Sequence, residues 1–522
     1  MDLAEASPAT GRETAMWLLE QLVPGSGVNN LNVTFRVEGA LRPDLLGQAL
    51  RVQVRRHDVL RTVFHADGGT LTKRVMVPEE AEPTIAHRDS TEETLTADLD
   101  AFVAEPFTLK DDQLLVRAAL FRLPDAHVFC LVAHHLIVDA MSMSILQNEL
   151  VGGYDTLLAG KTLSVEQVQA TPEAAPAPAS VEFWRSLLDG YVPSASSLRV
   201  GKQDLGEPTL SGDAVQRDLS TGARDVVHRL RRELHAPESV ILLAAYYLLL
   251  SLHGAGSDLI VGLPVSTRPP NALSAIGYHI NVLPLRVRVD PSGSFRALVA
   301  ATRSIFLEAL GHASVPAELF VARDARAWRS PLFRFLFNYV PHVHDAVGID
   351  FTIGGLAARQ LVEVENGFSR FDLEFFVPPL PSAERIRIRA VFRNQVFTRD
   401  EVELLLSRYD ELIVTVGGNV ERPVDGWPQP AREDKPAPVP TTADDGGPDW
   451  LVNDLLALWR ELLRRDGIEA DANFFTSGGN SLMGALLVQR IKKSINVPVK
   501  LADLFANPTP NMLAARLRER LP

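Results

Sequence analysis

Hydrophobic residues recur along the chain in two spacings, one typical of strands and the other of helices. Residues 33–37 alternate between apolar and polar side chains, which predicts a half-buried strand, and an amphipathic helix is expected from Pro43. The uncharged run 128–133 is rich in β-branched and aromatic residues and predicts a strand buried on both faces. A run with helical spacing follows from Ser142 to Leu150.

The second half of the chain repeats this alternation. A buried helix is expected at 238–251, because its apolar run Val240–Leu250 is well short of the ~20 residues that cross a bilayer. Residues 385–392 alternate between arginine and apolar side chains, which predicts a strand, and a helix with apolar residues from Val402 to Leu412 follows. The pattern therefore predicts two α/β halves.

Beyond these halves the composition changes. Residues 426–448 are rich in Pro, Asp and Gly, which is typical of a linker, and twenty-odd residues in a polyproline-like state would reach roughly 60 Å. Four helices are then predicted, at 450–463, 481–495, 501–505 and 510–521. The expected organisation is an N-terminal half at 1–175, a C-terminal half at 176–425, the linker at 426–448 and a helical bundle at 449–522.

Charge and cysteine content narrow the choice of partners. With a net charge of -13, the chain has no electrostatic reason to bind nucleic acid or an anionic membrane, and neither partner is expected. The single cysteine, Cys130, lies within an apolar strand, which predicts a core residue rather than a nucleophile and fits a reducing cytoplasm. The N-terminus lacks the basic and apolar pattern of a signal peptide.

The strand at 128–133 leads into the first candidate site, which contains His134, His135 and Asp139. Successive side chains on a strand point to opposite faces, so one histidine faces a site and the other packs. Adjacent histidines on a strand are also a poor chelate, and no metal is expected. The spacing alone does not say which histidine is functional.

The second candidate site is Ser481, at the first turn of a predicted helix and close after two glycines. The serine is either an N-cap or the acceptor of a phosphate-linked group, which the helix N-terminus would favour electrostatically.

A resemblance separates these alternatives. Residues 449–522 resemble a peptidyl carrier protein (thiolation) domain, in the segment Phe474-Phe-Thr-Ser-Gly-Gly-Asn-Ser-Leu482 and in the Pro-Thr-Pro start of the last helix. The resemblance implies that Ser481 carries a covalent 4'-phosphopantetheine, which a phosphopantetheinyl transferase would attach.

Residues 1 to about 425 resemble a condensation domain of nonribosomal peptide synthetases, from the fold family of chloramphenicol acetyltransferase. Four segments in the expected order carry the resemblance: Arg56-His-Asp-Val-Leu-Arg-Thr-Val-Phe64, His134-His-Leu-Ile-Val-Asp139, Ile276-Gly-Tyr-His-Ile-Asn-Val-Leu-Pro-Leu-Arg286, and Pro331-Leu-Phe through Phe337-Asn-Tyr339. It implies two acetyltransferase-like subdomains in a V shape with a tunnel between them, plus an all-α four-helix carrier bundle.

The resemblance also implies roles for the site residues. His135 matches the catalytic histidine of the family, His134 supports it by packing, and Asp139 orients the site through an ion pair with Arg286. From its strand pattern alone, Arg286 could instead lie on the solvated side of its strand. Ala140 stands where the family motif has Gly, and its methyl is expected to narrow the tunnel or to shift the backbone.

The implied reaction joins a donor acyl thioester on an upstream carrier protein to an aminoacyl group on the chain's own phosphopantetheine arm. No segment resembles an adenylation domain, so a stand-alone adenylation enzyme is expected to act in trans. Two alternatives remain open. The chain is a catalytically silent condensation-like domain that recruits tailoring enzymes to the carrier-bound group, or it forms an ester or amide with a soluble acceptor.

Overall fold

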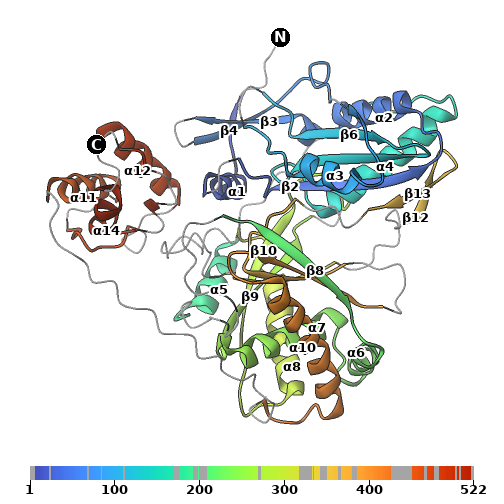
Figure 1. Cartoon of the computed structure of the whole chain (residues 1–522). Helices are drawn as coiled ribbons and strands as arrows, with labels where there is room; N and C mark the ends of the chain where they lie inside the picture. Colours follow the sequence, from blue (N-terminus) through green and yellow to red (C-terminus); the bar gives the residue numbers. More distant parts are fainter. Residues whose placement is uncertain are drawn as a thin grey trace. The chain divides into compact units, whose positions relative to one another are not determined.

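A computed structural model of the whole chain is shown in Figure 1. It divides into unit 1, which contains Met1–Ala174, Ser266–Ile280 and His342–Phe368, and unit 2, which contains Ala175–Val265, Asn281–Pro341 and Ser369–Pro522. The residues that the structure describes are 6–22, 25–67, 70–83, 85–109, 112–168, 176–191, 198, 201, 209–268, 272–316, 332, 334–340, 350–361, 366–378, 385–424, 449–463, 467–474, 481–495, 497–499, 503–504 and 507–518.

Unit 1 is built on a six-stranded sheet of order β12-β13-β2-β7-β6-β5. The strands are β2 (Asn30–Glu38), β5 (Ile85–Asp89), β6 (Val116–Arg122), β7 (Ala126–His134), β12 (Asp350–Ile353) and β13 (Leu356–Gln360). A smaller sheet has the order β1-β4-β3, from Ser7–Pro8, Thr70–Val75 and Thr62–Asp67. The helices are α1 (Gly11–Leu22), α2 (Pro43–Arg56), α3 (Leu95–Ala104) and α4 (Ala140–Leu158), with a 3₁₀ turn at Asp58–Arg61.

Strand β7 lies inside this sheet, paired with β2 on one side and β6 on the other. On one face, Val128 and Cys130 belong to a core that contains Phe102 of α3, and on the other face Phe129 contacts the ring of Phe35 at 5.3 Å. The predicted doubly buried strand is therefore confirmed. Burial raises the pKa of the Cys130 thiol to about 12, so this cysteine is a core residue rather than a nucleophile.

Two segments from the second half of the chain belong to unit 1. Strands β12 and β13 form an antiparallel pair, and β13 extends the sheet by pairing with β2. Residues 266–280 return to the same unit. These contacts join residues far apart in sequence, so no local pattern in the sequence predicted them.

Unit 2 contains a second six-stranded sheet, of order β10-β9-β11-β14-β15-β8. Its strands are β8 (Gly212–Asp218), β9 (Asp258–Ser266), β10 (Ile280–Arg288), β11 (Phe335–Tyr339), β14 (Leu373–Val377) and β15 (Arg387–Arg393). Its helices are α5 (Pro178–Leu188), α6 (Thr221–Glu233), α7 (Glu238–Leu250), α8 (Phe295–Leu310) and α10 (Arg399–Gly418). Ile388 and Ala390 of β15 are buried, as the alternation of residues 385–392 predicts.

Helix α7 lies in the core of unit 2. Every residue from Val240 to Leu250 is buried, and the ring of Tyr246 stacks on that of Phe375 in β14. The segment Glu238–Ala255 is the one stretch of the described residues that is apolar and long enough to cross a membrane, and 78% of it is buried in the protein. The helix therefore buries its apolar surface within unit 2, as its pattern predicts.

The described part of residues 449–522 is helical. It contains α11 (Asp449–Leu463), α12 (Ser481–Ser494) and α14 (Pro510–Arg518), and a core in which Trp459 meets Phe474 edge-on at 5.3 Å between ring centres. The helix expected at 501–505 falls largely outside the described residues, and so does the whole of the expected linker at 426–448.

Candidate functional site

His134 is the last residue of β7, and its side chain is almost fully buried. Its Nδ1 accepts a hydrogen bond from the backbone N–H of Leu136 at 3.1 Å, so the ring proton lies on Nε2. That nitrogen donates to Glu20 of α1 at 2.6 Å, and the ring meets Phe107 edge-on. Both nitrogens are occupied by protein partners, which gives His134 a packing role.

His135 begins the turn that follows β7, and its side chain is half-buried. Its Nδ1 lies 2.8 Å from the carbonyl oxygen of Val138. A carbonyl only accepts hydrogen bonds, so Nδ1 carries the proton and, in the neutral ring, Nε2 is the basic nitrogen. This tautomer is the one that a general base needs. The ring also lies against Tyr278, with 5.1 Å between ring centres and an angle of 77° between the planes.

Asp139 is the N-cap of α4, and its side chain is completely buried. Its Oδ1 accepts hydrogen bonds from Arg268 Nη2 at 2.6 Å and from the backbone N–H of Ser142 at 2.8 Å. Its Oδ2 accepts from Arg268 Nη1 at 2.8 Å and from the backbone N–H of His279 at 3.1 Å. We call Asp139, Ser142, Arg268, Gly277 and His279 the Asp139 cluster.

The charge of Asp139 is balanced within this cluster. Burial raises the pKa of the carboxyl, but the hydrogen bonds and charge of Arg268, together with Ser142, outweigh burial and hold the pKa below its ordinary value. Asp139 therefore stays ionised as the fixed anchor of a buried ion pair, and it does not exchange protons near neutral pH.

The expected pairing of Asp139 with Arg286 is wrong. Asp139 is neutralised by Arg268, whose side chain is equally buried. Arg286 lies on β10 and donates to Asp258 of β9, from Nε at 2.8 Å and from Nη2 at 2.6 Å. Asp258 raises the pKa of Arg286 through these bonds, so Arg286 ties two neighbouring strands of unit 2.

Four residues of the site escaped sequence reasoning: Ser142, Arg268, Tyr278 and His279. One signal was available for Arg268, because it lies two residues after the largely buried strand β9, and a charged residue near the end of such a strand is a candidate for an ion pair. No comparable signal marks Tyr278, whose contact with His135 joins residues far apart in the chain.

Ala140 is the first residue of α4 and is exposed. It lies in helical backbone, which an alanine adopts readily, so its methyl adds no backbone strain. Its expected effect on a tunnel stays a prediction.

Ser481 is the first residue of α12, as predicted. The fourteen residues of this helix run to Ser494, so its N-terminal dipole points toward the chain segment that precedes the serine and favours a negatively charged group there. This position fits a phosphodiester. The two glycines before it lie outside the described residues.

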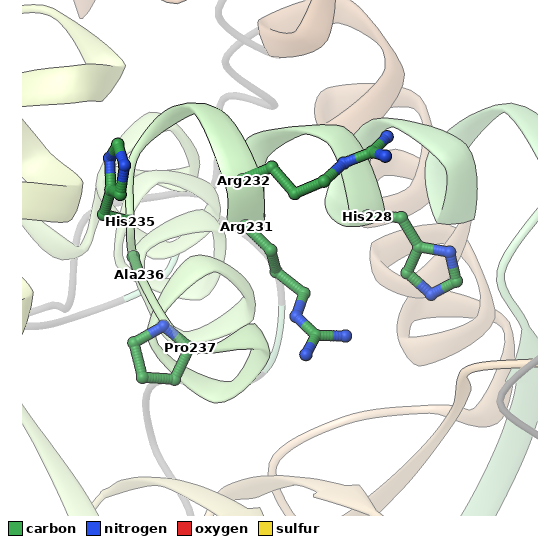
Figure 2. Close-up of a pocket in the computed structure, with 6 residues that line it drawn as sticks. All are labelled: His228, Arg231, Arg232, His235, Ala236 and Pro237. Atoms are coloured by element: carbon green, nitrogen blue, oxygen red, sulfur yellow. The ribbon is translucent and has the colours of Figure 1, made fainter.

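A surface hollow of about 690 Å³ lies at the end of α6 in unit 2, where Figure 2 shows its lining side chains. The hollow is lined by His228, Arg231, Arg232, His235, Ala236 and Pro237. Arg231 and Arg232 belong to the last turn of α6, where cations complement the helix dipole. No member of the Asp139 cluster lines this hollow, so we treat its positive charge as structural.

Within the ranges that the structure describes, no group of three or more His, Cys, Asp or Glu side chains is arranged to hold a metal ion.

Comparison with known families assigns both parts of the chain. The sequence model of the condensation domain matches residues 5–431, and that of the phosphopantetheine attachment site matches residues 453–517. The chain belongs to the condensation-domain family. A carrier domain follows, which implies a covalent 4'-phosphopantetheine and an encounter with a phosphopantetheinyl transferase and with carrier partners. Condensation domains of nonribosomal peptide synthetases are generally acyltransferases.

Curated relatives and solved structures agree with this assignment. The chain is 27% identical over 479 residues to an isonitrile lipopeptide synthase of Mycobacterium tuberculosis, with 84% of the chain and 19% of the relative covered. It is 27% identical over 434 residues to surfactin synthase subunit 1 of Bacillus subtilis, with 80% of the chain and 12% of the relative covered. The chain thus spans less than a fifth of the length of these relatives.

Among solved structures, the X-domain from teicoplanin biosynthesis matches with a TM-score of 0.69 at 21% identity, covering 81% of this chain and 98% of that one. The first condensation domain of the calcium-dependent antibiotic synthetase, in complex with a substrate analogue, matches with a TM-score of 0.63 at 19% identity, covering 81% and 99%. The α/β condensation fold and the helical carrier are confirmed.

Proposed function

We propose that this condensation-carrier protein forms an amide bond between a donor acyl thioester on a partner carrier and an aminoacyl group on its own arm. Ser481 is the residue that would hold the arm, and the arm supplies the acceptor as a thioester. The single observation that carries the proposal is the hydrogen bond from His135 Nδ1 to Val138, because it leaves Nε2 as the proton acceptor. We place this activity in the cytoplasm, and we assign residues 1–425 to condensation and residues 449–522 to the carrier.

The reaction moves one proton from the acceptor amine to the departing thiolate. The amine attacks the donor carbonyl carbon, so a C–N bond forms and the C–S bond to the donor arm breaks. His135 Nε2 takes the proton from the amine and returns it to the thiolate. A free α-amine has a pKa near 8, so a useful fraction is already nucleophilic at neutral pH. Positioned proton transfer typically contributes about 10²–10⁴-fold.

Holding both thioesters beside His135 would contribute more than the base. Converting an encounter between two carriers into a local step is worth up to ~7–11 kcal/mol when the reacting atoms are aligned. Partners follow from this scheme: an upstream donor carrier protein, and an adenylation enzyme acting in trans to supply the aminoacyl group.

The deciding experiment loads Ser481 with an aminoacyl arm, adds a donor carrier and reads the intact mass of the chain. Amide formation on the chain's own arm predicts that the loaded group grows by the mass of the donor acyl group. We expect His135→Ala to slow this growth by about 10²–10⁴-fold, the usual contribution of a general base. Loading of Ser481 is unchanged in that variant, and Ser481→Ala abolishes loading. Coupling at the wild-type rate by His135→Ala contradicts the proposal.

A second function is a catalytically silent domain that recruits a tailoring enzyme, and the observation that favours it is Ala140 in place of the motif glycine. A structure of an X-domain with OxyB from teicoplanin biosynthesis shares the fold of this chain. In the same assay, recruitment alone leaves the loaded mass unchanged in wild type. Release of the donor acyl group onto a soluble amine or hydroxyl, with no growth at Ser481, identifies the soluble-acceptor alternative.

A further inference from the structure

The segment Gly277–His279 is fastened to the Asp139 cluster on both sides of Tyr278. The backbone N–H of Gly277 donates to Ser142 Oγ at 3.0 Å, and the carbonyl oxygen of Gly277 lies 2.9 Å from the same hydroxyl. The backbone N–H of His279 donates to Asp139 Oδ2 at 3.1 Å. The two peptide groups that flank Tyr278 are therefore both bonded to residues at the start of α4.

Ser142 is the centre of this attachment. Its hydroxyl has one proton to donate and two lone pairs to accept with. It accepts from Arg268 Nη2 at 2.7 Å and from Gly277, and it lies within donating distance of both Asp139 and the Gly277 carbonyl. Asp139 is thus bonded to the 277–279 backbone in two ways. It accepts a hydrogen bond directly from the N–H of His279, and it is connected to Gly277 through the hydroxyl of Ser142.

The side chain of Tyr278 extends from this fixed backbone onto the ring of His135. The distance of 5.1 Å between ring centres and the angle of 77° give the edge-to-face contact that aromatic pairs prefer. The hydrogen bond from Nδ1 to Val138 fixes one atom of the imidazole. The edge-to-face contact with Tyr278 restrains the plane of the ring as well, and with it the direction of Nε2.

We propose that Tyr278 is a positioning residue for His135, and that Asp139 acts on His135 through it. Asp139 caps the helix that follows the His135 turn and also holds the backbone that bears Tyr278. The buried ion pair with Arg268 would then join two segments, separated by more than a hundred residues, into one support for the imidazole. The relevance of this support to coupling rests on the proposed function; the support itself is measurable without catalysis.

The test compares Tyr278→Phe with Tyr278→Leu in the full chain carrying its arm. Phenylalanine keeps the ring and removes the hydroxyl, whereas leucine keeps apolar bulk and removes the ring. The imidazole resonances of His135, assigned by their loss in His135→Ala, report the ring current of residue 278. We expect Tyr278→Phe, which keeps the ring, to shift these resonances and slow coupling less than Tyr278→Leu does. Tyr278→Leu should shift the resonances and slow coupling on the order of 10-fold, as misaligned catalytic groups do.

Two results overturn the positioning role: unchanged His135 resonances in Tyr278→Leu, or losses in Tyr278→Phe as large as those in Tyr278→Leu. A shifted His135 resonance in Tyr278→Leu with coupling unchanged supports the contact and contradicts the base role of His135. The failure of this inference and the failure of the proposed function are thus distinguishable. Thermal unfolding of both variants identifies any general loss of structure.

Discussion

At the scale of single residues, Asp139 shows how a buried charge is stabilised. Moving a carboxylate out of water is costly unless donors surround it, and here Arg268, Ser142 and the backbone of His279 provide them. Because the folded pKa of Asp139 is lowered, the stabilisation is present above the unfolded value of about 3.9 and is lost as pH falls through the folded value. The pair is therefore intact at neutral pH.

We expect Arg268→Met to destabilise the condensation part by about 3–5 kcal/mol, because it leaves a buried carboxylate without its cation. Chemical denaturation of the full chain measures this loss. Arg359→Met is the matched control, since Arg359 pairs with Asp350 where both side chains are about two-thirds exposed, at 68% and 67%. The control should cost far less. Equal losses in the two variants would contradict the account of Asp139.

At the scale of elements, the segment 277–279 connects strand β10 to the Asp139 cluster through its backbone, and it also carries the titratable ring of His279. The ring of His279 lies so close to Gly277 that a Cβ added there would be 2.6 Å from its Nε2. Burial and the positive charge of Arg268 lower the pKa of His279, with Asp139 opposing them. Folding therefore disfavours the protonated ring, and stability falls as pH drops through the unfolded value of about 6.5.

His279→Phe should remove this part of the pH dependence. Phenylalanine keeps an aromatic ring at this position and carries no titratable group. We expect the melting temperature of the variant to fall less than that of wild type between pH 7 and about pH 5, because no imidazole takes up a proton on unfolding. His87→Phe, at an exposed histidine of β5, is the control and should keep the wild-type slope. Identical slopes for all three proteins would count against the assignment.

At the scale of the whole molecule, the proposed function requires the carrier to reach the condensation site. The residues between the condensation part and α11 are rich in proline and charged side chains, and their sequence predicts an extended tether. An arm on such a tether meets the site at an effective concentration that the tether sets, and a tether too short to span the sites reduces that concentration to near zero. On the proposed function, the length of residues 426–448 is therefore expected to affect the coupling rate.

Deleting residues 428–440 should make coupling depend on protein concentration, because the arm of one chain would then have to reach the site of another. Loading of Ser481 should not change. Rates measured over a range of chain concentrations distinguish the two regimes, since an intramolecular step is independent of concentration. Replacing 428–440 by a Gly/Ser segment of equal length is the control and should retain concentration-independent coupling. If the chain with residues 428–440 deleted also couples at a rate independent of its concentration, the length of the tether does not limit coupling.

Local patterns in the sequence were enough to determine β7, α7, β15, the start of α12 and the unequal situations of His134 and His135. The strands and helices follow from the spacing of apolar residues, which neighbouring residues decide among themselves. The two histidines differ, as predicted, although the reason is that β7 ends at His134 and His135 begins the turn. The family resemblance added the two kinds of domain and the phosphopantetheine. It paired Asp139 with the wrong arginine.

Only the tertiary structure decided the partner of Asp139, the residue against His135 and the strands at the edge of the first sheet. Arg268 lies 129 residues from Asp139 along the chain, and β13 pairs with β2 across more than three hundred residues. Several arginines satisfy the charge requirement of a buried carboxylate equally well in sequence. Which of them pairs with Asp139 is determined by the packing of the segment Ser266–Ile280 within unit 1, and that is a property of the tertiary structure rather than of any local pattern.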